Sequence, residues 1–145
     1  MEYNFKKVHT GKDLAISTIV FLAAICLFFV NKELGICTEI CSIFMFVFYK
    51  GGYKLDGQGI LLTKYSEELC KDYMPSITDF LNGKDVIPQI KKGFEGGSVR
   101  LDVYYNATAG IAYAQLFDFI NYSYVPVTGI IELNTPRADT LIAQL

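Results

Sequence analysis

Two long apolar segments near the N-terminus constrain the fold more than any other feature of the sequence. Residues 14–30 (LAISTIVFLAAICLFFV) contain no charged side chain. As a helix they would be about 25 Å long, slightly less than the roughly 30 Å hydrocarbon core of a bilayer. A buried helix of a small water-soluble domain normally keeps a polar stripe, whereas this segment has only Ser17 and Thr18. The pattern predicts a membrane-spanning helix.

A cleaved signal peptide is the alternative for this segment, because Lys6, Lys7 and Lys12 supply the basic start that such peptides have. The apolar run is long for a signal peptide, however, and no good cleavage site follows it. Cys26 is preceded by Ile25, where a lipoprotein signal would have a small residue. We therefore expect a retained span.

The second apolar segment, residues 34–49 (LGICTEICSIFMFVFY), is interrupted by Glu39 and is the weaker candidate for a span. The short link at residues 31–33 suits an antiparallel helical hairpin. Both helices are short for a typical bilayer, so local thinning is expected around them. A re-entrant or interfacial second helix is the alternative.

Lysines near the ends of the apolar segments predict the orientation, because cytoplasmic flanks of membrane helices are enriched in Lys and Arg. Three precede the first segment, Lys32 alone lies between the segments, and Lys50, Lys54 and Lys64 follow the second. We therefore expect both termini in the cytoplasm. Because the layout is small and simple, we expect the plasma membrane of a bacterium, the inner membrane, as the location.

From Lys50 onward the sequence reads as ordinary globular protein, with nine Lys/Arg and eleven Asp/Glu. This slightly acidic balance argues against nucleic acid as a partner, which would need clustered cations. The four cysteines form no Cys-x-x-Cys pair and the chain has a single histidine, His9, so neither a disulfide framework nor a zinc site is predicted. No cofactor is expected.

We predict a membrane-anchored α+β chain, in which a two-helix transmembrane hairpin precedes a small domain made of a helix, a three-stranded antiparallel sheet and a helix. Residues 1–50 form the hairpin, 51–63 a glycine-rich hinge and 64–145 the cytoplasmic domain. Within the hinge, residues 53–56 and 60–63 could form short strands across an Asp56-Gly57 turn. The first expected element of the domain is a helix kinked at Pro75, or two short helices, over residues 64–82, with Gly83 as its cap. Strands are expected from 98 to 105, 111–120 and 124–133, and a helix at 136–145 follows a Thr135 cap.

Two alternatives remain within this pattern. Residues 107–119 also fit a helix, which competes with the second strand. Pro126 lacks the N–H that a sheet ladder needs, so it favours an edge position for the third strand.

Glu39 is the sharpest candidate for function, because carboxylates in membrane helices are costly and often functional. It could bind a cation, relay a proton or pair with a partner's cation; the alternative is a glutamate near interfacial water. Beside it, Thr38, Ser42 and Gly35 give the second helix a slim surface, together with Cys37 and Cys41. Packing of this surface on Ala15, Ala23 and Ala24 of the first helix is favoured over an oligomer contact.

Tyrosines cluster around the expected sheet and form a candidate interaction surface. Tyrosine offers a large contact area with a polar tip, and it is enriched at interfaces. Ordinary core packing is the alternative. The residues concerned are Tyr104, Tyr113, Tyr122 and Tyr124, with Tyr105 nearby.

Catalysis is not expected, because the segment after the hairpin has no histidine to activate a nucleophile. Asp102 and Asp118 lie on adjacent expected strands and are a weak candidate carboxylate pair. The leading hypothesis is a non-enzymatic interaction or regulatory module on the membrane surface that binds another protein or a second copy. The alternative is a subunit of a small oligomeric pore or transport complex that uses Glu39.

Overall fold

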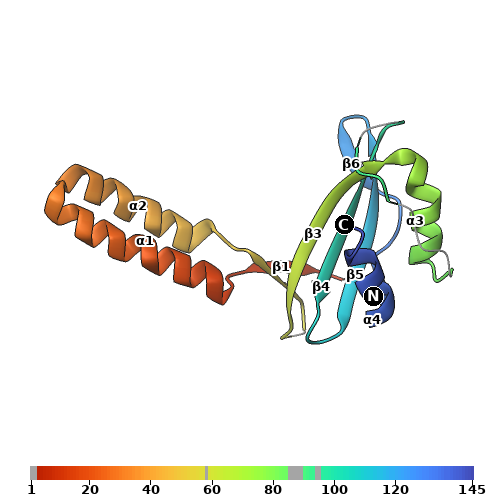
Figure 1. The fold of residues 1–145 in the computed structure, drawn as a ribbon, viewed down its shortest axis with the longest axis horizontal. Coiled ribbons are helices and arrows are strands. Elements are labelled where there is room, and N and C mark those ends of the chain that lie inside the picture. The colour runs from red at the N-terminus through yellow and green to blue at the C-terminus, as the bar shows by residue number, and fades with distance from the viewer. Residues whose placement is uncertain (1–2, 58, 85–89, 94–95) are drawn as a thin grey trace.

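A helical hairpin projects from an antiparallel sheet that carries two short helices on one face (Figure 1). The structure is a computed structural model and describes residues 3–57, 59–84, 90–93 and 96–145. Its elements are β1 (Phe5–Val8), α1 (Gly11–Val30), α2 (Lys32–Phe48), β2 (Gly52–Leu55), β3 (Leu61–Cys70), the 3-10 turn η1 (Lys71–Tyr73), α3 (Met74–Leu81), β4 (Ser98–Asn106), β5 (Ile111–Ile120), β6 (Ser123–Pro126), β7 (Ile131–Leu133) and α4 (Thr135–Ile142).

The expected α+β class is confirmed at this level: a packed helix pair comes first and an antiparallel sheet with short helices follows. The prediction of three strands was wrong, because the described residues form seven. Their order is β1-β2-β3-β4-β5-β6, and β7 also pairs with β5. The expected third strand is divided into β6 and β7, both of which pair with β5.

The largest correction concerns the helix expected at residues 64–82. Residues 61–70 form the strand β3, which pairs with β4 from Thr63↔Tyr105 to Cys70↔Ser98. Tyr65 and Leu69 are four residues apart, and an even spacing of four fits one face of a strand as well as one face of a helix. Pairing with β4 favours the strand over the helix here. Pro75 lies in the first turn of α3 rather than at a kink.

Strands β4 and β5 lie where the sequence predicts them, and β5 is central because it pairs with β4 on one side and with β6 and β7 on the other. Pro126 lies on the edge strand β6, as expected. Gly83 follows α3 with φ +96°, the left-handed conformation of a helix cap. The α4 cap is Asn134 rather than Thr135, because the Asn134 side chain accepts a hydrogen bond from Arg137 N–H.

The segment expected as a hinge, residues 51–63, contains β2 and the start of β3, which pair through Tyr53↔Leu62. The Asp56-Gly57 turn lies between them, and Gly57 has φ +83°. Strand β1, which the sequence did not predict, pairs with β2 from Phe5↔Leu55 to Val8↔Gly52. The hairpin is therefore joined to the rest of the chain by the paired strands β1 and β2, which we call the stalk.

The main core lies between one face of the sheet and the helices α3 and α4. A second cluster lies where the stalk crosses the opposite face. There the Phe5 ring stacks on Tyr104 at 4.0 Å between centroids, and Tyr3 packs on Tyr113. These contacts fix the inner end of the stalk to the sheet. Residues of the main core are Leu69, Ile77, Phe80, Leu81, Val99, Leu101, Val103, Ala112, Ala114, Leu116, Leu133, Ala138 and Leu141.

Candidate functional site

The seam between α1 and α2 is made of small side chains. Ser17, Ala24, Gly35 and Ser42 are buried, and the Ser42 hydroxyl donates a hydrogen bond of 3.1 Å to the Ser17 carbonyl. At Gly35 the helices approach so closely that an added Cβ would lie 2.5 Å from the Cα of Phe28. Small residues permit such approach of helix backbones.

The small residues that the sequence places on one surface of the second helix therefore meet the first helix only in part. Gly35 and Ser42 are buried in the seam, where Gly35 lies against Phe28 and Ser42 bonds to Ser17. Thr38 is half-buried, and its hydroxyl donates to the Leu34 carbonyl of its own helix. Four other small residues lie on the exposed surface instead: Ala15, Ala23, Cys37 and Cys41.

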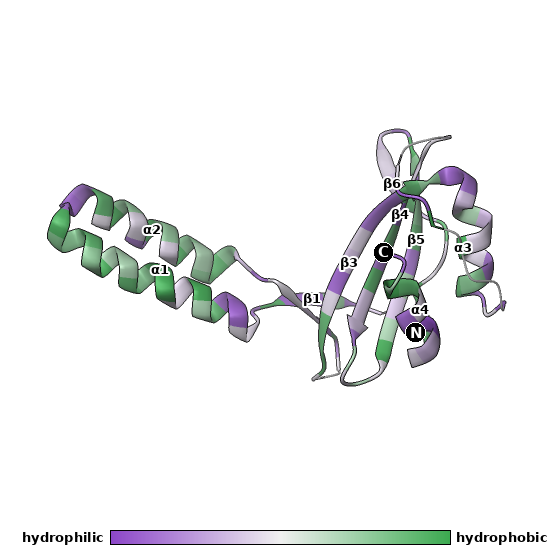
Figure 2. Ribbon diagram, viewed as in Figure 1, coloured by the Kyte–Doolittle hydropathy of each residue, from purple (hydrophilic) through white to green (hydrophobic). Residues whose placement is uncertain are grey.

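Most residues of the hairpin are hydrophobic (Figure 2), and its large apolar side chains are exposed. Phe29 and Val30 near the tip are 83% and 85% exposed. The pair is thus inverted relative to a water-soluble helix pair, since small and polar groups lie inside and large apolar groups lie outside. The exposed residues are Leu14, Ile16, Ile19, Phe21, Leu22, Ile25, Leu27, Phe28, Phe29 and Val30 on α1, and Leu34, Ile36, Ile40, Ile43, Phe44, Phe46, Val47 and Phe48 on α2.

Among the described residues, one helix, Gly11–Val30, is long and apolar enough to cross a membrane. A signal sequence near an N-terminus has the same length and composition. The packing of α1 on α2 therefore says more about a membrane location than the hydropathy of α1 alone. α2 is shorter, with 17 residues.

Glu39 lies near the middle of α2 and is exposed on its outer surface. The hairpin has a groove of about 240 Å³ in the half nearer the stalk. Ser42, one helical turn after Glu39 in α2, lies in the wall of this groove. The groove is lined by Ser17, Thr18, Phe21, Ser42, Ile43 and Phe46.

Asp13 joins the two ends of the hairpin at its base. Its carboxylate accepts a hydrogen bond of 2.7 Å from the Thr10 N–H and one of 2.8 Å from the Gly51 N–H. The Thr10 hydroxyl in turn accepts from the Asp13 N–H, which completes a capping box. The Thr10-x-x-Asp13 spacing could have revealed the cap, but nothing local to it points to Gly51.

The tyrosines of the predicted interaction surface lie in different environments. Tyr104 and Tyr113 are cross-strand neighbours on the sheet face opposite the helices, and Tyr113 is 1% exposed beneath the stalk. Tyr124 reaches over the same face, whereas Tyr122 is 96% exposed in the β5–β6 turn with φ +61°. The interaction surface stays a prediction, with Tyr122 as its exposed member.

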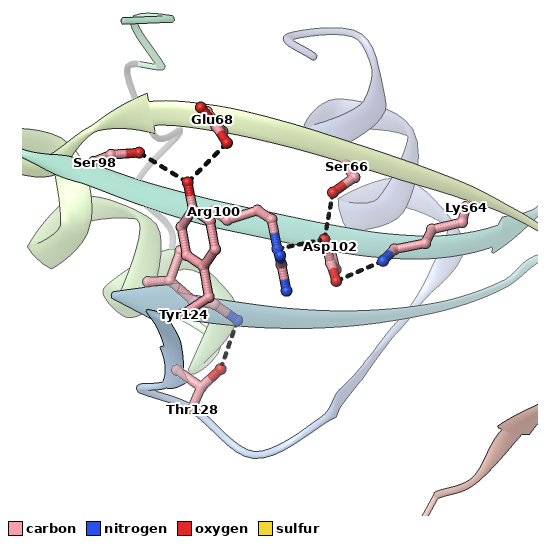
Figure 3. A network of polar contacts seen from close by, with 9 residues as sticks. Lys64, Ser66, Glu68, Ser98, Arg100, Asp102, Tyr124 and Thr128 are labelled. Atoms are coloured by element: carbon pink, nitrogen blue, oxygen red, sulfur yellow. Dashed lines mark hydrogen bonds and ion pairs between the residues drawn. The ribbon is translucent and has the colours of Figure 1, made fainter. Parts of the chain in front are cut away.

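A polar network covers this open sheet face (Figure 3). At its centre the Asp102 side chain, from β4, is almost fully buried. It accepts a hydrogen bond of 2.6 Å from Ser66 and forms an ion pair of 2.7 Å with Lys64, both from β3. Arg100 Nε lies 3.2 Å from Oδ1 of Asp102, the same oxygen that accepts from Ser66, in a geometry that is an ion pair but not a hydrogen bond.

Aromatic rings complete the network. The Arg100 guanidinium lies over both the Phe117 and the Tyr124 rings, at 4.6 and 4.4 Å from their centroids. The Tyr124 hydroxyl donates a hydrogen bond of 2.8 Å to Glu68 and lies 3.2 Å from the Ser98 hydroxyl. The sequence pointed to Tyr124 but not to its polar partners, which come from the two strands β3 and β4.

Burial and charge shift three pKa values in this network. Burial alone would lower the pKa of Lys64, but its hydrogen bond to Asp102 and the charge of that carboxylate outweigh burial and raise it. Burial raises the pKa of Tyr104. Burial also raises the pKa of Tyr124, and the hydrogen bond to Glu68 acts in the same direction.

The weak candidate carboxylate pair, Asp102 and Asp118, does not form. Asp102 is opposite Gln115 and Asp118 is opposite Val99, so the two carboxylates lie on opposite faces of the sheet. Asp118 instead accepts two hydrogen bonds from the Lys71 ammonium. Within the ranges that the structure describes, no three His, Cys, Asp or Glu side chains are grouped to hold a metal ion.

In comparisons with known proteins, no protein-family model, no curated protein and no solved structure matches the chain.

Proposed function

We propose that this chain is a small integral membrane protein in which the hairpin lies in lipid and holds the sheet domain at the membrane surface as a non-enzymatic interaction or regulatory module. The inverted packing of the hairpin carries this proposal. Its seam buries serines, glycine and alanine, and its outer surface consists of leucine, isoleucine, valine and phenylalanine.

The energy of those outer side chains favours lipid over water. Burying one large apolar side chain is worth about 1.5–3 kcal/mol, and eighteen such side chains are exposed along the hairpin. A domain of this size, with a total stability of about 5–15 kcal/mol, would bury them in a core if water surrounded the hairpin. In lipid the same arrangement has no such cost, because the tails are equally apolar.

The lengths are consistent with a bilayer. α1 has 20 residues and is about 30 Å long, which matches the hydrocarbon core. α2 has 17 residues and is about 25 Å long, so the membrane would thin locally around it. Asn31, Lys32 and Glu33 would place polar groups at the far headgroup layer.

The stalk supports the proposal that the sheet domain and the segment before α1 lie on the same side of the membrane. Because β1 and β2 are hydrogen-bonded neighbours, the chain enters and leaves the hairpin at the same end. Lysines are concentrated at that end, which favours the cytoplasmic face of the plasma membrane. The exposed Tyr122, with Phe119, Ile120 and Val125 on the adjoining strands, is the surface through which the domain would contact a partner.

Fractionation of cells that express the full chain tests the proposal. The chain should sediment with membranes, stay there through an alkaline high-salt wash and dissolve in detergent. Recovery from the soluble fraction as a compact, monodisperse species without detergent would overturn it.

A second function has one specific observation in its favour, the outward position of Glu39. The residue lies seven positions from Lys32 and nine from Phe48, so its Cα is about 10 Å along the helix from the nearer end. A glutamate at that depth facing lipid is costly unless it contacts a polar group. This arrangement supports an oligomeric pore or transport subunit in which Glu39 contacts a neighbouring chain.

Mass measurement in a mild detergent distinguishes this candidate. As a pore subunit, the wild-type chain would form an oligomer that Glu39→Leu disrupts. Glu33→Leu at the tip of the hairpin is the matched control and should leave the mass unchanged. A monomer for both wild type and variants would reject the oligomeric pore and leave the membrane anchor intact.

A further inference from the structure

Four lysines surround the base of the hairpin, and we call them the lysine collar: Lys7 in β1, Lys12 in the first turn of α1, Lys50 after α2, and Lys54 in β2. All four side chains are exposed. None forms an ion pair with a carboxylate of the described residues. The positive charge of the collar is therefore available to an external anion.

The two described carboxylates near the collar have other partners. Asp13 is buried and accepts hydrogen bonds from backbone N–H groups, and Asp56 forms an ion pair of 2.8 Å with Lys6. By contrast, residues 56–145 contain seven Lys/Arg and eleven Asp/Glu. Positive charge is thus concentrated at the hairpin base, and the domain beyond it is acidic.

The collar lies at the depth where headgroups would be. Lys12 and Lys50 flank the first and last apolar turns of the hairpin, and Lys7 and Lys54 lie within the four-residue stalk strands. A four-residue strand is about 13 Å long, and a headgroup layer is about 5–8 Å thick. Long lysine side chains can extend along apolar surface and place their ammonium groups in that layer. The Lys7 ammonium is 5.9 Å from the Tyr53 ring centroid.

We propose that the lysine collar binds the headgroups of anionic phospholipids and so fixes the stalk, and with it the sheet domain, at the membrane surface. The inference rests on the proposed membrane location of the hairpin and specifies the lipid class that its base selects. Attraction to an anionic surface changes an association constant by about fivefold for each lysine close to it. The acidic domain would be repelled by the same surface, so the collar and the domain act in opposite directions.

Electron spin resonance with spin-labelled lipids tests the collar. The full chain is reconstituted in phosphatidylcholine vesicles, and the fractions of spin-labelled phosphatidylglycerol and spin-labelled phosphatidylcholine that it immobilises are compared. Wild-type protein should prefer the anionic probe by at least fivefold, and high salt should reduce that preference.

Charge-removing pairs locate the effect. Lys7→Gln/Lys54→Gln and Lys12→Gln/Lys50→Gln should each reduce the preference several-fold. Lys84→Gln/Lys92→Gln removes the same charge from lysines distant in the sequence and should leave the preference at the wild-type value. An equal reduction by all three pairs would show a net-charge effect and would overturn the collar.

Failure of the collar and failure of the membrane anchor give different results. If wild-type protein immobilises both lipids equally, the hairpin is in the bilayer but the collar does not select anionic lipid. If neither lipid is immobilised because the chain does not enter vesicles, the proposed function itself is wrong.

Discussion

Asp102 is the residue on which the open face of the sheet depends. It is 3% exposed, yet it bears charge and is surrounded by Lys64, Arg100 and the Ser66 hydroxyl. A buried carboxylate is tolerated only when such partners compensate for its lost hydration. Removal of the carboxylate leaves two cations on a largely covered surface without their anion.

Asp102→Ala should therefore lower the free energy of unfolding by about 3 kcal/mol. Asp79→Ala is the matched control, because Asp79 pairs with Lys84 in an exposed ion pair. Such pairs contribute about 0–1 kcal/mol. Urea unfolding in detergent measures both variants, and equal effects would contradict the central role of Asp102.

The same network predicts how stability depends on pH. The folded state raises the pKa of Lys64 and of Tyr104, so it retains those protons at pH values where the unfolded chain loses them. Their contribution is complete below about pH 10, the ordinary range of both groups, and is lost as pH rises through the higher folded pKa values.

The urea midpoint in detergent should therefore fall between pH 9 and pH 11. In Tyr104→Phe the fall should be shallower. Tyr122→Phe changes a ring that is 96% exposed and should follow the wild-type curve. A midpoint in wild-type protein that does not change above pH 10 would count against the network.

At the scale of elements, close approach of α1 and α2 depends on Gly35. Alanine normally stabilises a helix relative to glycine by about 0.5–1 kcal/mol. At position 35, however, the new Cβ would lie 2.5 Å from the Phe28 backbone of α1. The two effects have opposite signs, and the steric one is larger.

Gly35→Ala should destabilise the hairpin by about 1–3 kcal/mol. Gly11→Ala, at a helical glycine with open space around it, should be neutral or slightly stabilising. Thermal unfolding in detergent, followed by the helical circular dichroism signal, gives both values. A stabilised Gly35→Ala would show that the helices do not pack along this seam.

The accuracy of the sequence predictions follows the physics of each element. The two helices of the hairpin were predicted because their apolar runs are long, and β4 because its residues alternate with a period of two. The pattern of β5 fitted a strand but also a competing helix. β3 was mistaken for a helix because its identity depends on pairing with β4, which is distant in sequence. β1 was missed because four residues, FKKV, form a strand only through pairing with β2 across the whole hairpin.

The candidate sites divide in the same way. Gly35 and Ser42 could be placed in the seam because helical spacing and side-chain size suffice to put them there. The network around Asp102 could not be predicted, because Lys64, Arg100 and Tyr124 come together only when β3, β4, β5 and β6 pair in register.

For the whole molecule, the decisive feature is the contrast between its two parts. The sheet domain buries its leucines and valines under α3 and α4, as proteins in water do. The hairpin turns its large apolar side chains outward around a seam of small residues. The packing of the sheet domain fits water, whereas the packing of the hairpin fits the proposed lipid environment. The stalk and the lysine collar lie where these two parts join.

Thiol labelling tests this contrast most directly, because the chain carries native probes. Cys26, Cys37 and Cys41 are all exposed on the hairpin, whereas Cys70 is buried in the sheet domain. In membrane vesicles opened to admit a membrane-impermeant maleimide, a hairpin that lies in lipid should leave the wild-type chain unlabelled until it is denatured. Lys84→Cys adds an exposed thiol on the domain and should label at once. Rapid labelling of the hairpin cysteines without denaturant would contradict a hairpin in lipid.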